Sequence, residues 1–330
     1  MSKPGEPLPL PDSIDLAFEH DQTLRYGENP HQRAGLYVPE GSRGALGGAE
    51  QLQGKEMSYN NWLDTDAARA ISSQFELPTV VIVKHQNPCG VATAVDDNLA
   101  EAYERARLCD ETSAYGGIVS ANYLVDRETA EAISKIFTEV VIAPGYTKEA
   151  RRILSEKDSL RVLLAPGQRV PAADDLEYRS IDGAVLVQNP DWVTEAAREE
   201  RIPGAESVTG VEPTNQQWLD LIFAWRVAGR VKSNAILLAK DETTVGVGPG
   251  QPNRLDSVAI AVERAGDQAK GSVLASDAFF PFADGVEKAI EAGVSAIIQP
   301  GGSKRDPEVV VAAKKAGIPM IFTGTRHFRH

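Results

Sequence analysis

The sequence predicts an α/β protein with mostly parallel sheets, in which one strand–helix unit occurs twice. Short apolar strands alternate with helical segments in two regions of the chain, and this order requires crossover connections between parallel strands. Ser120 and Pro144 mark the ends of successive strands in the first region, and Ser276 and Pro300 mark them in the second. Both pairs have the same spacing, and one shift of 156 residues (120 to 276, 144 to 300) relates them. This equality favours an internal duplication.

The second region supplies the clearest series of elements. Apolar residues predict three strands, at 273–276, 294–298 and 318–322. Asp284 can cap a helix that ends at Gly293. Asp306, with Pro307 at the first helical position, begins another helix that ends at Gly317. Such a series predicts a parallel sheet.

The first region repeats this order. Apolar residues predict strands at 117–120, 140–142 and 161–165. Asp126 can cap the helix between the first two strands, and residues 147–154 form the next helix. Residues 175–210 are expected to join the two regions.

A further apolar strand, with a lysine and an asparagine at one end, precedes each region. Residues 80–83 lead into Lys84-His85-Gln86-Asn87, and Lys232-Ser233-Asn234 leads into residues 235–238. Polar side chains at the ends of buried strands are where α/β folds usually bind ligands. These residues are therefore candidates for a site, although the alternative that they merely end a strand stays open.

Composition and charge exclude several classes of protein. The net charge of −13 and the pI near 5.0 argue against a nucleic-acid scaffold. Two cysteines, Cys89 and Cys109, are too few for a disulfide framework. No apolar run approaches the roughly 18 residues of a membrane helix, and the start of the sequence lacks the pattern of a signal peptide. We expect a soluble, cytoplasmic protein with no membrane and no nucleic-acid partner.

Seven motifs follow one another along the chain. In the first, Arg25 can hold a phosphate with its planar guanidinium and Tyr26 adds a hydroxyl donor. The motifs are RYGENPHQ at 25–32, KHQNPCG at 84–90, SAYGG at 113–117, VKSN at 231–234, GPGQPNR at 248–254, SDAFFPF at 276–282 and RHFRH at 326–330. Together they closely resemble the formyltransferase (AICAR transformylase) domain of the bifunctional purine biosynthesis enzymes.

The resemblance implies a reaction and an architecture. The reaction moves the formyl group of 10-formyltetrahydrofolate to the 5-amino group of aminoimidazole carboxamide ribonucleotide (AICAR), giving FAICAR and tetrahydrofolate on the way to IMP. The architecture is two cytidine-deaminase-like α/β subdomains, residues 1–185 with an N-terminal arm and residues 186–330, in a homodimer with active sites at the interface. The family's IMP cyclohydrolase domain would precede residue 1. We therefore expect no cyclohydrolase activity here and a separate cyclohydrolase downstream.

Zinc does not follow from this resemblance. A zinc deaminase needs a His-x-Glu element and a Pro-Cys-x-x-Cys element. Ala92 stands where a second cysteine would follow Cys89, and no glutamate follows His85 at the required position. We expect no zinc, which disfavours a hydrolytic deaminase. A catalytically silent nucleotide-binding protein is the other alternative, and the intact Lys84, His85, Asn234 and Arg25 argue against it.

The implied chemistry requires a base, because the amine is a weak nucleophile that must lose a proton as it attacks the formyl carbon. In the family's pattern His85 is that base. Lys84 beside it can stabilise the oxyanion that develops on the formyl oxygen. Asn234 fits as a donor that polarises the carbonyl.

The resemblance assigns further residues to two ligands. For AICAR it carries over Arg25, Tyr26, Gly116, Glu139, Phe279 and Arg326, with the arginines facing phosphate. For formyl-folate it carries over Arg254, Asp284, Gly302 and Ser303. It also suggests a monovalent cation, potassium, near Ser233, Asp277 and His330. His20 and His327 are expected at the surface.

Overall fold

A computed structural model describes residues 9–40, 46–94, 96–172, 174–193 and 201–330. A 12-stranded sheet forms its centre. The first half of the chain contributes β3 (Glu50–Gln53), β4 (Thr79–Lys84), β5 (Asn87–Thr93), β6 (Gly117–Ala121), β7 (Thr138–Ala143) and β8 (Arg161–Leu164). The second half contributes β11 (Glu206–Ser207), β12 (Ile236–Lys240), β13 (Thr243–Gly248), β14 (Val273–Ser276), β15 (Ala296–Gln299) and β16 (Met320–Phe322).

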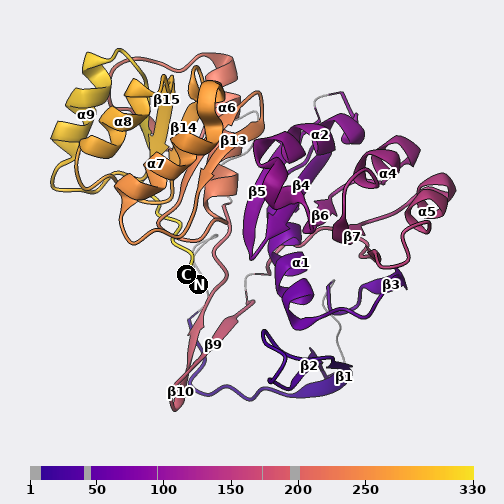
Figure 1. Ribbon diagram of the computed structural model, residues 1–330. Coiled ribbons are helices and arrows are strands. Elements are labelled where there is room, and N and C mark those ends of the chain that lie inside the picture. Colours follow the sequence, from indigo (N-terminus) through magenta and orange to yellow (C-terminus); the bar gives the residue numbers. More distant parts are fainter. Residues whose placement is uncertain (1–8, 41–45, 95, 173, 194–200) are drawn as a thin grey trace.

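The strand order divides the sheet between the halves of the chain. It is β11-β16-β15-β14-β12-β13-β5-β4-β6-β7-β8-β3, so each half occupies one side (Figure 1). Counted outward from the centre, the order β13-β12-β14-β15-β16 repeats the order β5-β4-β6-β7-β8. The two halves therefore share one topology.

The sheet is mixed. The strands β6, β7 and β8 pair in parallel, as do β14, β15 and β16, so the two predicted parallel series are confirmed. The hairpins β4–β5 and β12–β13 are antiparallel, and β5 joins β13 in antiparallel fashion at Thr243 and Ala92. The expectation of mostly parallel sheets thus holds for the two outer series of strands, whereas the strands at the centre of the sheet pair in antiparallel fashion.

Helices cover both faces. The first half has α1 (Tyr59–Ser72), α2 (Leu99–Cys109), α3 (Glu111–Ala114), α4 (Arg127–Ile133) and α5 (Lys148–Leu154). The second half has α6 (Asn215–Ala228), α7 (Arg254–Ala265), the 3-10 helix η1 (Gly266–Ala269), α8 (Asp284–Glu291) and α9 (Asp306–Lys315). The residues of α1 and α6 share one apolar core on one face, and this core includes strand residues of both halves. On the other face each half has its own core, beneath α2, α4 and α5 or beneath α7, α8 and α9.

Glycines explain why β5 and β13 were not predicted as strands. Gly90 and Gly246 resemble turn signals in the sequence. In the structure they let a helix approach the sheet: a Cβ on Gly90 would lie 1.8 Å from the carbonyl oxygen of Ala106 in α2, and a Cβ on Gly246 would lie 2.1 Å from that of Ala261 in α7. These glycines therefore serve helix packing and not chain reversal.

Matching positions recur in α1 and α6. Ser58 and Asn61 form a capping box at the start of α1, and Thr214 and Gln217, each 156 residues later, form one at the start of α6. The shift that the sequence indicates for the later strands therefore also relates these helices.

Two hairpins lie outside the main sheet (Figure 1). They are β1 (Phe18–Leu24) with β2 (Ala34–Pro39), and β9 (Glu177–Ile181) with β10 (Ala184–Gln188). The expected subdomain boundary, between residues 185 and 186, falls within β10. Among the described residues, no helix has the length and apolar character to cross a membrane.

Candidate functional site

The turn between β4 and β5 carries the predicted base. His85 and Gln86 form a two-residue turn with φ of 53° and 62°, across which Lys84 pairs with Asn87. Left-handed backbone costs roughly 1–2 kcal/mol for a residue other than glycine. The Asp64 carboxylate of α1 offsets this cost, because Oδ2 accepts the N–H of His85 (2.9 Å) and Oδ1 accepts that of Gln86 (2.8 Å). The imidazole of His85 is left exposed.

Lys84 and Gly116, two predicted site residues, lie next to each other. The Nζ of Lys84 donates to the carbonyl oxygen of Tyr115 (2.9 Å) and lies 4.0 Å from where a Cβ on Gly116 would be. Gly116 has φ of 74° and donates its N–H to the carbonyl of Phe137 (2.8 Å). The rings of Tyr115 and Phe137, with centroids 5.6 Å apart, are both exposed beside it. The lysine therefore faces a small surface of aromatic side chains and backbone.

Glu139 follows in β7, two residues after Phe137. Its Oε2 pairs with Nη1 of Arg161 at 2.6 Å, and Arg161 also donates from Nε to the carbonyl of Glu56 (2.8 Å). The carboxylate stays about one third exposed. Arg161 therefore holds Glu139 in place beside the Gly116 region.

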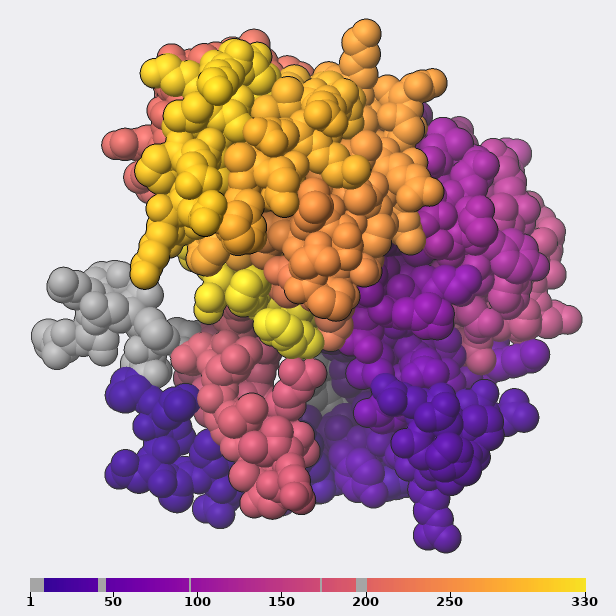
Figure 2. All heavy atoms as spheres, turned by 60° about the vertical axis from the view of Figure 1, so that its left-hand side comes forward, coloured from indigo at the N-terminus to yellow at the C-terminus, as the bar shows by residue number. Residues whose placement is uncertain are grey.

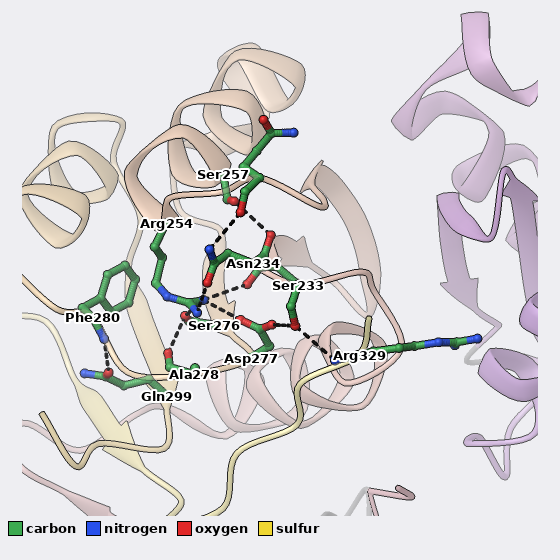
Figure 3. Close-up of polar contacts among 12 residues, drawn as sticks. Ser233, Asn234, Arg254, Ser257, Ser276, Asp277, Ala278, Phe280, Gln299 and Arg329 are labelled. Atoms are coloured by element: carbon green, nitrogen blue, oxygen red, sulfur yellow. Dashed lines mark hydrogen bonds and ion pairs between the residues drawn. The ribbon is translucent and has the colours of Figure 1, made fainter. Parts of the chain in front are cut away.

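Asn234, the predicted polarising donor, has a fixed side-chain amide (Figure 3). Its Nδ2 donates to the carbonyl oxygens of Gln251 (2.8 Å) and Pro252 (3.2 Å). Its Oδ1 accepts from Nη2 of Arg254 at 2.7 Å, and its own carbonyl accepts from Ser257 (2.9 Å). The three side-chain contacts fix the orientation of the amide, and the fourth holds the backbone of Asn234.

Arg254 lies inside the protein and connects Asn234 to Asp277 (Figure 3). The Nη1 atom pairs with Oδ1 of Asp277 at 2.5 Å and donates to Oγ of Ser276 at 2.9 Å. The arginine side chain is 5% exposed and that of Asp277 is 0% exposed. The other oxygen of Asp277 accepts from Ser233, whose Oγ also accepts the N–H of Arg329. The structure thus turns this predicted folate residue toward Asn234.

The two polar strand ends of the sequence lie side by side. The Oδ1 of Asn87 accepts the N–H of Lys232 at 3.2 Å, which joins the β4–β5 turn to the Lys232-Ser233-Asn234 segment. Ser233 also contacts the C-terminal tail, donating its N–H to the carbonyl of Arg329 at 2.8 Å. Two motifs that are far apart in the sequence therefore lie together in one region of the structure.

The loops after β14 and β15 meet at one edge of the sheet, as expected for parallel strands. Phe280 donates its N–H to Oε1 of Gln299 (3.0 Å), and the guanidinium of Arg305 lies 4.8 Å from the ring centroid of Phe282. Asp284 is exposed at the first turn of α8. This edge also holds Phe279, which is 37% exposed, and Gly302 and Ser303. The predicted folate residues other than Arg254 therefore gather here.

The predicted phosphate residues stand on separate segments. Arg326, in the C-terminal tail, lies over the ring of Phe328 at 4.4 Å. His330 follows, with its ring centroid 5.6 Å from that of Phe328. Arg25 and Tyr26 follow β1 in the outer hairpin, and Arg25 lies 5.6 Å from the centroid of the Tyr26 ring. Figure 1 shows this hairpin apart from the main sheet.

The cysteines are poor metal ligands. Burial raises the pKa of Cys89 to about 12 and that of Cys109 to about 11, so both thiols stay protonated near neutral pH. The described residues contain no group of three or more His, Cys, Asp or Glu side chains placed to hold a metal ion.

The sequence analysis missed one feature of the site and misjudged another. Asp64 was not singled out, although Asp220 lies 156 residues later and accepts the N–H of Glu242 in the β12–β13 turn (2.8 Å). The duplication could have indicated both aspartates. The expectation for His327 was wrong: this residue is 2% exposed, its Nδ1 contacts Asp191 at 2.9 Å, and its ring lies 5.2 Å from that of Trp225.

Comparison with known proteins assigns the chain to a family. Residues 2–264 match the family described as AICARFT/IMPCHase bienzyme. The chain is 51% identical to the bifunctional purine biosynthesis protein PurH of Cyanothece sp. over 331 residues, covering 100% of this chain and 62% of that protein. It is 52% identical to PurH of Roseobacter denitrificans (94% of this chain, 60% of that protein) and 48% identical to PurH of Bacillus anthracis (97% and 61%).

The chain thus spans about three fifths of the length of the curated relatives that it matches. The family match includes the motif turns at 84–87 and 231–234 and Arg254 itself. The chain belongs to the AICARFT/IMPCHase bienzyme family.

Proposed function

We propose that this chain transfers the formyl group of 10-formyltetrahydrofolate to the 5-amino group of AICAR, giving FAICAR and tetrahydrofolate in purine biosynthesis. The observation that carries the proposal is the exposed His85 on a turn that Asp64 holds, next to Lys84 and joined through Asn87 to the Asn234 segment. The family membership of the chain and the names of its relatives support it. We infer that the reaction takes place in the cytoplasm.

The residues divide the chemistry as follows. His85 accepts the proton that the amine loses as its nitrogen attacks the formyl carbon. The ammonium of Lys84 stabilises negative charge on the formyl oxygen, and it is available beside Gly116 with one carbonyl as partner. Asn234 donates to the carbonyl from an amide that Arg254 holds in orientation. The tetrahydrofolate nitrogen then leaves with its electron pair and takes up a proton.

Ligand contacts follow the motif residues. We assign AICAR to Arg25, Tyr26, Gly116, Glu139, Phe279 and Arg326, and the folate to Asp284, Gly302, Ser303 and Arg254. Arg254 acts in this proposal through Asn234, because its two Nη atoms already have partners inside the protein. A homodimer would bring the outer hairpin of one chain to the site of the other.

A potassium ion is proposed near Ser233, Asp277 and His330. Both oxygens of Asp277 accept hydrogen bonds, so a cation there competes with Arg254 and Ser233. We also propose that the halves are cytidine-deaminase-like subdomains that arose by duplication and bind no zinc. The repeated strand order and the paired capping boxes support the duplication.

The test is the His85→Ala variant. Purified protein is mixed with AICAR and 10-formyltetrahydrofolate, and the ultraviolet change that accompanies tetrahydrofolate formation is followed. Loss of a general base typically costs about 10²–10⁴-fold in turnover, whereas calorimetry should show AICAR binding unchanged. His20→Ala, which removes an exposed histidine of β1, is the control and should keep full activity. Turnover by His85→Ala at the wild-type rate would remove His85 from the mechanism.

A further inference from the structure

A cavity of about 540 Å³ lies where the two halves meet the β9–β10 hairpin and the C-terminal tail. Its walls include Gln86 of the motif turn, Lys232 after α6, Arg179 of β9, and the tail residues Phe328 and Arg329. Figure 2 shows the tail, in yellow, against the hairpin, in pink. The volume is in the range of small-molecule sites.

The charges of this cavity are unbalanced. Five cationic side chains line it, those of Arg169, Arg179, Arg230, Lys232 and Arg329, against three carboxylates, those of Asp66, Glu177 and Asp191. The carboxylates already have partners: Asp66 pairs with Arg169 (2.7 Å), Asp191 contacts His327 (2.9 Å), and Glu177 accepts from Gln188 (3.2 Å). With Arg169 paired to Asp66, four cationic side chains remain against the two carboxylates of Glu177 and Asp191, so positive charge is in excess.

The cations stand close enough to oppose one another. Burial lowers the pKa of Arg230 to about 10, and the charge of Arg329 adds to the shift. Burial also lowers the pKa of Lys232, with Arg329 and Arg179 adding to it. Arg230 is 6% exposed, and its Nε has no hydrogen-bond partner within the described residues. Such mutual repulsion is relieved when an anion binds.

We propose that this cavity binds a small organic anion with at least two negatively charged oxygens, a phosphate monoester or a dicarboxylate. Lys232 and Arg179 supply charge at its rim and Arg230 at its base, while Phe328 and Leu186 provide apolar walls. The site differs from the proposed phosphate contacts Arg25 and Arg326, neither of which lines the cavity. It does not depend on the proposed formyl transfer, because it stands on the cavity and its charges.

Calorimetric titration of the whole chain, without nucleotide or folate, tests this site. The probes are ribose 5-phosphate, glutarate and inorganic phosphate. One probe should bind saturably at one molecule per chain, and whether ribose 5-phosphate or glutarate binds tighter identifies the anion as phosphate or carboxylate. Lys232→Gln and Arg179→Gln should each weaken binding roughly 10- to 100-fold, as for loss of one charge-assisted hydrogen bond.

Two sets of controls separate the outcomes. Lys240→Gln removes an exposed lysine at the matching turn of the second half and should leave the affinity unchanged. Arg25→Gln and Arg326→Gln should also leave it unchanged. No saturable binding of any probe, equal affinity in Lys232→Gln and the wild type, or loss of binding only in Arg25→Gln or Arg326→Gln would each overturn the proposal.

Discussion

Removing the Asp64 carboxylate should disable the turn that carries the proposed base, His85, without unfolding the protein. In Asp64→Ala, the N–H groups of His85 and Gln86 lose acceptors at 2.9 and 2.8 Å. Hydrogen bonds to a charged group contribute about 1.5–3 kcal/mol each, and water can replace part of this because Asp64 is half-buried. A net loss of about 2–3 kcal/mol is comparable to the roughly 2–4 kcal/mol that two left-handed residues cost.

The turn should then leave its left-handed conformation, and His85 should lose its place. At about 1.4 kcal/mol per tenfold change, turnover should fall roughly 30- to 150-fold. The assay is kcat and KM for formyl transfer, together with urea unfolding. Adding Gln86→Gly to Asp64→Ala should restore about tenfold of the rate, because glycine adopts positive φ without this cost.

Asp220 provides a matched control inside the same chain. It accepts the N–H of Glu242 in a turn where Asp241 and Glu242 have φ of 51° and 49°, the counterpart of the His85 turn. Asp220→Ala should lower the free energy of unfolding by a similar amount and leave kcat unchanged at temperatures where the variant is folded. The reasoning is refuted if Asp64→Ala turns over like the wild type, or if folded Asp220→Ala loses as much turnover.

Three further predictions concern packing, charge and thiols. Gly90→Ala should cost about 3 kcal/mol of unfolding free energy in urea, because the new Cβ meets the Ala106 carbonyl at 1.8 Å; an unchanged midpoint would contradict this packing. Arg254→Met should cost about 3–5 kcal/mol because it leaves Asp277 buried and unpaired, whereas Arg264→Met, at a half-exposed pair with Asp110, should cost less than about 1 kcal/mol. Native Cys89 and Cys109 should resist Ellman's reagent at pH 8 and react after denaturation. Rapid labelling of the native protein would argue against buried thiols. The raised pKa values also mean that the thiols contribute their full stability below about pH 9 and that this contribution is lost as pH rises toward 11–12.

The sequence was informative where local patterns decide the structure. The helix capped by Asp126 and the two parallel series form as predicted. The predicted caps Asp284 and Asp306 were wrong: each is the first residue of its helix, and the residue before it, Ala283 or Arg305, makes no side-chain capping hydrogen bond. The equal spacing of 156 residues, noted from four landmarks, extends to the caps of α1 and α6.

Features that depend on distant contacts were missed. Gly90 and Gly246 are strand residues because a helix carbonyl packs against each, which no local pattern indicates. Arg254 points inward because Asp277, buried and 23 residues later, takes its charge. His327 is buried because Asp191, 136 residues earlier, meets its Nδ1. In each of these three cases the deciding contact comes from a residue outside the local sequence pattern.

The antiparallel pairing of β5 with β13 limits how this protein can move. Many two-lobed enzymes enclose their substrates by hinge bending, which needs a flexible joint between rigid bodies. Here the backbone pair of Thr243 with Ala92 and a shared apolar core cross the joint. The side chain of Thr244 also accepts the N–H of Val91 (2.8 Å) and donates to its carbonyl (3.2 Å). Bending the two halves toward each other would break these contacts, so the distance between the His85 turn and Asn234 is fixed when the chain folds. Shielding of the proposed reaction from water therefore falls to parts outside this joint: the two outlying hairpins, the tail, or a second subunit.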